Sequence, residues 1–114
     1  MIEWDRVAEL RDEVGAEDFA EVVELFLDEV EATLARIGAD PALDQLERDL
    51  HFIKGSALNL GFSELAALCL KGERSARAGH AEAIELPLIA ETFRVSRSVF
   101  LDGLGPGTDA RLVG

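Results

Sequence analysis

Residues 50–62 read LHFIKGSALNLGF, and the interpretation of the whole chain starts from this stretch. It continues a line of apolar residues at the 3-4-3-4-3 spacing that is typical of a helix packed in a bundle. The members of this seam are Leu43, Leu46, Leu50, Ile53, Ala57 and Leu60. Asp40-Pro41 gives a strong helix start signal, and Gly61 supplies a left-handed residue at the end. The pattern predicts one helix between these two signals.

Similar periodicities predict four further helices. A short first helix is expected from Asp5, as its N-cap, to Gly15, and a longer second one over residues 17–38. A fourth helix should run from a cap at Ser63 to near Gly79, and a fifth from residue 86 to about residue 102. Short connections imply antiparallel neighbours, so we expect an all-α, up-down four-helix bundle with an additional short N-terminal helix. Residues 1–102 would form a single domain, and residues 103–114 a flexible tail.

The composition excludes several classes of function. The 23 acidic against 11 basic residues give a net charge of −12, which disfavours nucleic acid and anionic membranes as partners. No apolar run approaches the roughly 20 residues of a membrane span. The lone cysteine, Cys69, fits a reducing compartment. We therefore expect a cytoplasmic protein, acting as a monomer.

His51 stands apart from the apolar seam. At about 100° per residue it lies roughly 130° from the centre of the seam, so it should face solvent or a partner. Lys54 follows one turn later, and Gly55 lies beside the ring without a side chain. Glycine inside a helix costs about 0.5–1 kcal/mol relative to alanine. It is best explained where a Cβ would obstruct another molecule approaching the imidazole.

An accessible imidazole beside a cation suits phosphoryl transfer. A neutral imidazole is a nucleophile, and the loose transition state of phosphoryl transfer asks mainly for positioning and charge compensation. The chain holds no glycine-rich loop of the Walker type and no nucleotide-binding pattern. The phosphoryl group is therefore expected to come from another protein and not from ATP bound to this chain.

These residues carry a resemblance to a known family. The pattern His51-x-x-Lys54-Gly55-Ser56-Ala57-x-x-Leu60-Gly61 closely resembles the signature of histidine-containing phosphotransfer (HPt) domains, and the helix after it, with Leu65, Leu68, Cys69 and Glu73, resembles the next helix of that family. In element order the similarity covers residues 3–101. The resemblance implies an antiparallel four-helix bundle with an additional N-terminal helix, as the periodicities do.

The resemblance also implies roles for single residues. His51 would be phosphorylated on Nε2, Lys54 would support the charge of the phosphoryl group, and Gly55 would be a notch that gives access to the ring. The remaining motif residues would support helix packing or a polar contact at the helix end: Ser56, Ala57, Asn59 and Gly61. The partners would be response-regulator receiver domains and an upstream sensor or hybrid histidine kinase. The Mg²⁺ for the chemistry would be held by the receiver, with no cofactor or metal site on this chain.

Other residues leave alternatives open. Leu58 and Phe62 fall near the His51 line and suggest a docking surface, but Phe62 could instead fold back onto the bundle. Lys71, Arg74 and Arg77 form either a solvated face or a patch that contacts an acidic receiver pocket. Cys69 is either a small core residue or a redox sensor. His80 is expected in a surface loop.

Taken together, the sequence predicts a phosphocarrier of a two-component phosphorelay, with no kinase activity of its own. It would accept a phosphoryl group on His51 from a receiver aspartate or hybrid kinase and pass it to a response regulator. The alternatives are a helical adaptor without chemistry, a phosphate sink that drains a regulator by back-transfer, and a dimeric phosphotransferase resembling a histidine-kinase core.

Overall fold

Every element of regular secondary structure that the described residues form is a helix. The computed structural model describes residues 2–39 and 43–113 and contains α1 (Trp4–Val14), α2 (Phe19–Ala39), α3 (Leu43–Leu60), α4 (Ser63–Arg77), a short 3₁₀ helix η1 (Ala81–Ala83) and α5 (Leu86–Val113). No strand occurs in these ranges, and extended pairing is limited to an isolated bridge between Ile2 and Phe62. The predicted all-α class is confirmed.

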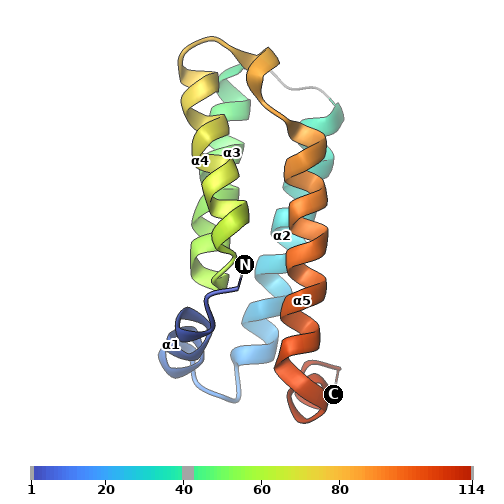
Figure 1. Cartoon of the computed structure of the whole chain (residues 1–114). Coiled ribbons are helices and arrows are strands. Elements are labelled where there is room, and N and C mark those ends of the chain that lie inside the picture. Colours follow the sequence, from blue (N-terminus) through green and yellow to red (C-terminus); the bar gives the residue numbers. More distant parts are fainter. Residues whose placement is uncertain (1, 40–42, 114) are drawn as a thin grey trace.

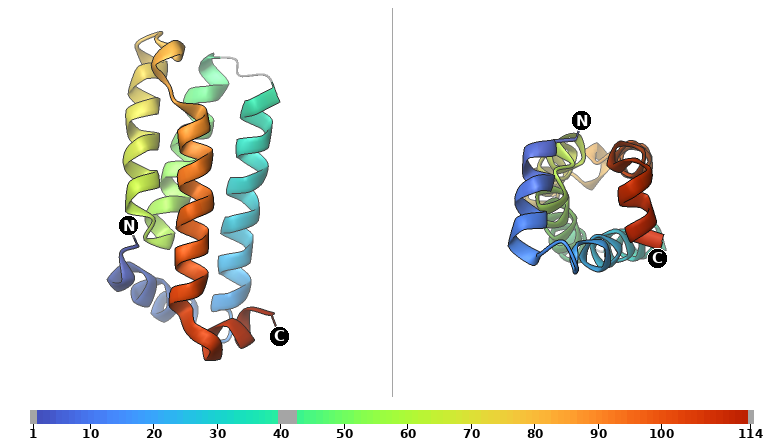
Figure 2. Two further views of the ribbon diagram at one scale, coloured as in Figure 1. Left: turned by 45° about the vertical axis from the view of Figure 1, so that its right-hand side comes forward. Right: turned by 90° about the horizontal axis from the view of Figure 1, so that it is seen from below.

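Four of the helices lie side by side along the long axis of the molecule. Figure 1 shows α4 and α5 in front, with α3 behind α4 and α2 behind α5, and the second view in Figure 2 agrees with this arrangement. The molecule measures 45 × 24 × 21 Å. α1 lies across one end of these helices (Figure 2). The closest helix pair is α3 and α4, which share the most extensive contacts.

The core follows the predicted seam of α3. Leu50, Ile53 and Ala57 are fully buried, and Leu46 and Leu60 nearly so. They meet buried apolar residues of the other four α-helices. Burial of this apolar surface supplies most of the driving force for folding. Because α3 is fixed along this seam, the face opposite to it is presented to solvent at a defined angle.

The junction between α3 and α4 needs a glycine. Gly61 has φ +77°, a left-handed conformation, as the sequence predicts. The Glu3 backbone N–H donates to the Gly61 carbonyl at 2.7 Å. A Cβ on residue 61 would lie 2.7 Å from the Glu3 carbonyl oxygen. The N-terminal segment therefore closes directly over the end of the helix that carries His51.

Some helix boundaries differ from those predicted. α1 begins at Trp4, with Glu3 as its N-cap, so Asp5 lies in the first turn instead of capping the helix. α5 continues to Val113 through the segment that the sequence favours as a flexible tail; the domain limit at residue 102 stays a prediction. The start signal Asp40-Pro41 lies outside the described residues.

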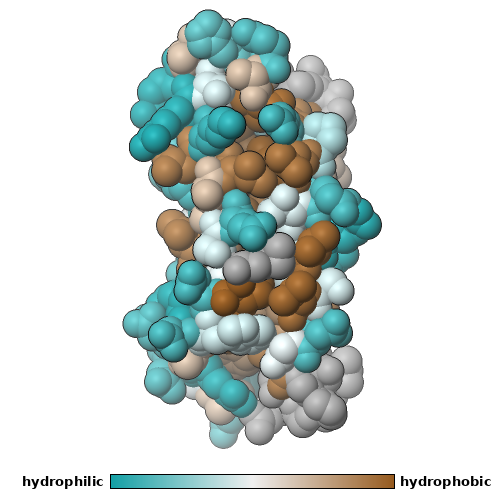
Figure 3. All heavy atoms as spheres, viewed as in Figure 1, coloured by the Kyte–Doolittle hydropathy of each residue, from teal (hydrophilic) through white to brown (hydrophobic). Residues whose placement is uncertain are grey.

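The surface between α4 and α5 is partly apolar. Figure 3 shows apolar side chains gathered along the middle of this face. Leu88, Val95 and Val99 of α5 are each about two-fifths exposed. Across the described residues, no helix combines the length and the apolar character that crossing a membrane requires.

Candidate functional site

His51 projects from the outer face of α3. Its neighbours Leu50 and Ile53 are fully buried, whereas the His51 side chain is 70% exposed. The imidazole thus has the accessibility that the helix periodicity predicts. An exposed ring on a rigid, well-packed helix is positioned for a partner as large as another protein.

One ring nitrogen of His51 is held by a buried carboxylate from the neighbouring helix. Nδ1 lies 3.2 Å from Oε2 of Glu73, on α4. The Glu73 side chain is only 5% exposed. Since Nδ1 faces Glu73, Nε2 is the ring nitrogen that is open to a partner.

The same carboxylate also holds Lys54. Lys54 Nζ lies 2.9 Å from Glu73 Oε1, and the lysine side chain is 20% exposed. Arg77, one turn along α4, approaches Glu73 Oε2 at 3.7 Å and pairs with Glu47 of α3 at 3.0 Å. Glu73 is therefore the centre of a charged cluster in the seam between α3 and α4. The Lys54 ammonium is anchored in this seam close to the His51 ring.

The environment of Glu73 favours its ionised form. Burial of the carboxyl acts to raise its pKa, but the hydrogen bonds and positive charges of Lys54 and His51 outweigh this effect and hold the pKa of Glu73 below its ordinary value. A charged carboxylate is a strong hydrogen-bond acceptor. It can hold a protonated Nδ1 and compensate a positive charge that develops on the ring.

Gly72 allows α4 to bring Glu73 close enough to His51. Gly72 is buried, and a Cβ on it would lie 2.9 Å from Cδ1 of Leu50, the residue that precedes His51. A side chain at this position would displace the end of the Leu50 side chain. Gly72 thus lies at the close approach of α3 and α4, whose register brings His51 to Glu73 and Glu47 to Arg77.

Gly55 has open space where its side chain would be. A Cβ built on it meets no atom within 4 Å, leaving out the helix's own backbone, and its φ is not positive. Neither the packing nor the backbone conformation of this chain therefore requires glycine here. The open space is on the same side of α3 as His51, one turn along.

The other predicted motif residues lie in the places expected for support. Ser56 and Ala57 are buried, 4% and 0% exposed, which suits the role of small packing residues. Asn59 Oδ1 accepts a hydrogen bond from Arg6 Nη2 at 3.1 Å, and so joins α3 to α1. These three residues stabilise the helix that carries His51, whereas the ring itself is held by Glu73.

The two candidate docking residues differ. Leu58 is 56% exposed and lies two turns from His51 on the same face. Phe62 is 0% exposed and packs edge-to-face on Phe100, with ring centroids 5.4 Å apart. The fold-back alternative therefore holds for Phe62, and docking through its ring is ruled out. Phe52, which adjoins His51 and is 41% exposed, supplies an aromatic surface that the sequence reading overlooked.

Cys69 and His80 lie apart from the exposed face of His51. Cys69 is fully buried, and burial together with the charge of Glu73 raises the pKa of its thiol to about 12. A protonated, inaccessible thiol is a poor redox sensor. His80 is exposed and its Nδ1 lies 3.3 Å from Glu82 Oε1. Within the described residues, no three side chains of the metal-binding types (His, Cys, Asp, Glu) are grouped so that they could hold an ion.

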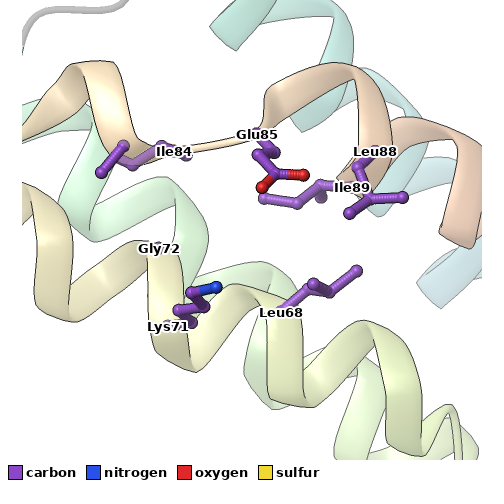
Figure 4. Close-up of a pocket in the computed structure, with 8 residues that line it drawn as sticks. Leu68, Lys71, Gly72, Ile84, Glu85, Leu88 and Ile89 are labelled. Atoms are coloured by element: carbon purple, nitrogen blue, oxygen red, sulfur yellow. The ribbon is translucent and has the colours of Figure 1, made fainter.

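A small pocket occurs on the opposite flank of α4. Figure 4 shows Leu68, Lys71 and Gly72 of α4 facing Ile84, Glu85, Leu88 and Ile89 across it. Its volume is about 50 Å³, far below the roughly 300 Å³ at which small-molecule sites begin. It does not include His51.

The partnership of Glu73 with His51 is the main feature that the sequence reading missed. From the sequence, Glu73 is noted only as part of the family resemblance, and no contact with His51 is predicted for it. A signal was available, because Glu73 follows Leu65, Cys69 and Gly72 on the inward stripe of its helix, where an unpaired carboxylate is costly. A buried carboxylate requires a cationic or hydrogen-bonding partner, and His51 and Lys54 are the partners the fold provides.

Comparison with known proteins gives one match. The family model described as "Hpt domain" matches residues 21–98, a range that runs from α2 into α5 and includes the whole His51 cluster. No curated protein and no solved structure matches the chain.

Proposed function

The chain belongs to the Hpt domain family, and from this premise we propose that it carries a phosphoryl group on Nε2 of His51. It accepts the group from the phosphorylated aspartate of a receiver domain, or from a hybrid kinase, and passes it to the aspartate of a response regulator. Hpt domains are phosphocarriers of two-component phosphorelays. The assignment of the carrier atom in this chain rests on geometry.

The observation that carries the proposal is an exposed imidazole whose Nδ1 is bound to a buried carboxylate, at 3.2 Å from Glu73. Nucleophilic attack requires a lone pair on the attacking nitrogen. If Nδ1–H donates to Glu73, the lone pair of the neutral ring resides on Nε2 and faces solvent. Glu73 thus selects the tautomer and fixes the orientation of the ring.

The reaction then proceeds by in-line displacement. The N–P bond to Nε2 forms as the P–O bond to the partner's aspartate breaks, and the electron pair of that bond stays on the aspartate carboxylate. The ring gains positive charge while its proton stays on Nδ1, hydrogen-bonded to Glu73, whose negative charge compensates it. Return transfer reverses each step, so the same residues serve uptake and delivery.

Lys54 and Gly55 have supporting roles in this proposal. The Lys54 ammonium is held in the seam by Glu73 at 2.9 Å, close enough to the ring to favour an incoming dianionic group. Gly55 leaves open space one turn from His51, which a receiver domain can use for close approach. Leu58 and Phe52 offer exposed apolar surface for its docking.

We further propose that α2 to α5 form the antiparallel, up-down four-helix bundle of the family, with α1 as an additional helix, in one domain that ends near residue 102. This is supported by the pairings of His51 with Glu73 and of Glu47 with Arg77, which require α3 and α4 to run in opposite directions. We take the carrier to act as a monomer in the cytoplasm, where a single accessible His51 suffices for transfer.

The test is phosphoryl uptake from receiver domains that have been phosphorylated in the presence of Mg²⁺. Wild type should acquire a label that is lost in mild acid and survives base, as expected of phosphohistidine. The His51→Gln variant should acquire none. Persistent failure of the wild type across several receivers, or label retained by His51→Gln, would instead favour a helical adaptor.

A further inference from the structure

The positive charge of this acidic chain is concentrated on α4. α2 carries five acidic residues against Arg36 alone, whereas α4 carries Lys71, Arg74 and Arg77 against Glu64 and Glu73. Among the described helices, α4 is the one in which basic side chains outnumber acidic ones. Because Glu73 is buried beneath Lys54 and His51, the outward charge of α4 is more positive still.

Two of these cations have no charged partner among the described residues. Six other basic residues lie within ion-pair distance of a carboxylate: Arg6, Arg36, Lys54, Arg77, Arg94 and Arg97. Lys71 and Arg74 form no ion pair with any described residue, although the chain has a twofold excess of carboxylates. Their charges are therefore available to a partner.

The surface around them is hollowed and partly apolar. An open hollow of about 360 Å³ is lined by Lys71, Arg74 and His80 together with Ala67, Leu70, Ser75 and Ala78. Small and apolar side chains between cations suit a protein surface that presents carboxylates around an apolar contact.

This surface adjoins the face that carries His51. Arg74 lies one turn before Arg77, and Arg77 is 3.7 Å from the same Glu73 oxygen that binds His51. The antiparallel pairing of residues 51 with 73 and 47 with 77 places residue 58 level with residue 66. Exposed Leu58 of α3 is therefore at about the level of exposed Ala67 of α4 along the helix pair.

We propose that the outer face of α4, from Ala67 to His80 and centred on Arg74, is the second half of the docking surface and recognises an acidic patch on the protein that exchanges phosphoryl groups with His51. The proposal rests on the proposed function. The occupant is acidic by its own chemistry, since a site that bears an aspartate and binds Mg²⁺ needs clustered carboxylates. α3 would supply the reacting group and α4 the electrostatic recognition.

Recognition of this kind acts mainly on the rate of encounter. Complementary charge can raise association rates by tenfold or more at low ionic strength, and salt removes the effect because the Debye length falls from about 10 Å at 0.1 M to about 3 Å at 1 M. The acidic α2 packs against α3, α5 and α1 and shares no extensive contact with α4 in the described part of the chain. It would repel the same partner from the opposite side and so help to orient it.

The experiment compares Arg74→Glu with a matched control, Arg94→Glu. Both arginines are exposed, and both replacements change the charge equally, but Arg94 lies on α5 beside Glu91, away from the proposed surface. Phosphoryl transfer to the full chain is measured from aspartate-phosphorylated receiver domains, using one that phosphorylates the wild type. Circular dichroism checks that each variant remains folded, as expected for side chains that bear no buried contact.

At 20 mM NaCl the second-order transfer rate should fall about tenfold for Arg74→Glu and less than about twofold for Arg94→Glu. The first-order rate at saturating receiver should stay within about twofold of wild type, which separates docking from chemistry. In 0.5 M NaCl the two variants should converge. Equal rates for the two variants at low salt, with a wild type that transfers normally, would overturn the docking role of α4 and leave the proposed function standing. A wild type that accepts no phosphoryl group would overturn both.

Discussion

Replacing Gly55 by alanine should stabilise the fold and slow phosphoryl transfer, because the added methyl group meets nothing inside the molecule but obstructs an approaching partner. The Cβ of residue 55 has no neighbour within 4 Å outside its own helix backbone. Alanine in a helix interior is favoured over glycine by about 0.5–1 kcal/mol. For a domain of this size the gain corresponds to a rise in Tm of about 2–6 °C.

The matched control is Gly72→Ala, on the facing helix. Here the new methyl would lie 2.9 Å from Cδ1 of Leu50, a fully buried side chain that would have to shift. Overpacking of a core typically costs about 1–3 kcal/mol. The same substitution should therefore lower stability at residue 72 and raise it at residue 55.

Urea unfolding can be followed by the fluorescence of Trp4, the single tryptophan, which stacks on Phe100 with ring centroids 5.9 Å apart. Transfer from a phosphorylated receiver should fall about tenfold in Gly55→Ala, since small misplacements of reacting groups are costly. A loss of stability in Gly55→Ala would show that the fold itself needs this glycine. Higher stability with unchanged transfer would show that partners do not use the open space.

Three further predictions concern single residues. The pKa of Glu73 in the folded protein is lower than its ordinary value of 4.5, so the stabilisation that Glu73 gives should be fully present above pH 4.5. It should be lost as the pH falls through the pKa of Glu73 in the folded state. Glu73→Gln should remove this part of the pH dependence of urea unfolding. Leu58→Asp should weaken receiver binding while the circular dichroism of the helices stays unchanged. Leu25→Asp on α2, where the side chain has the same 56% exposure, should leave receiver binding unchanged. Equal binding by the two variants would show that the docking surface does not include Leu58. Cys69, buried and with its pKa raised to about 12, should react with iodoacetamide at pH 8 only after unfolding, and rapid labelling of the native protein would contradict its burial.

The exposed position of His51 could be predicted because it depends on one helix alone. The seam of α3 fixes which side of the helix is buried, and the 3.6-residue period then places His51 outside. Gly61 was predictable for a similar reason, since a helix end that requires a left-handed residue favours glycine.

Contacts between helices were harder to predict. The meeting of His51 with Glu73 depends on how closely α3 and α4 approach, and Gly72 lies at this approach, where a Cβ would meet Leu50. Helical periodicity shows that Glu73 lies on the inward side of its helix, but it does not show which residue of another helix Glu73 meets. The burial of Phe62 likewise depends on Phe100, a residue 38 positions later in the chain.

The central claim is that Glu73 holds Nδ1 of His51 and leaves Nε2 as the phosphorylated atom. Long-range ¹H–¹⁵N NMR of the two histidine rings, with His51→Gln to assign them, tests it before and after phosphorylation. The account predicts a neutral His51 ring protonated on Nδ1, followed by a phosphorus–nitrogen bond on Nε2. A ring protonated on Nε2, or phosphorylated on Nδ1, would contradict it.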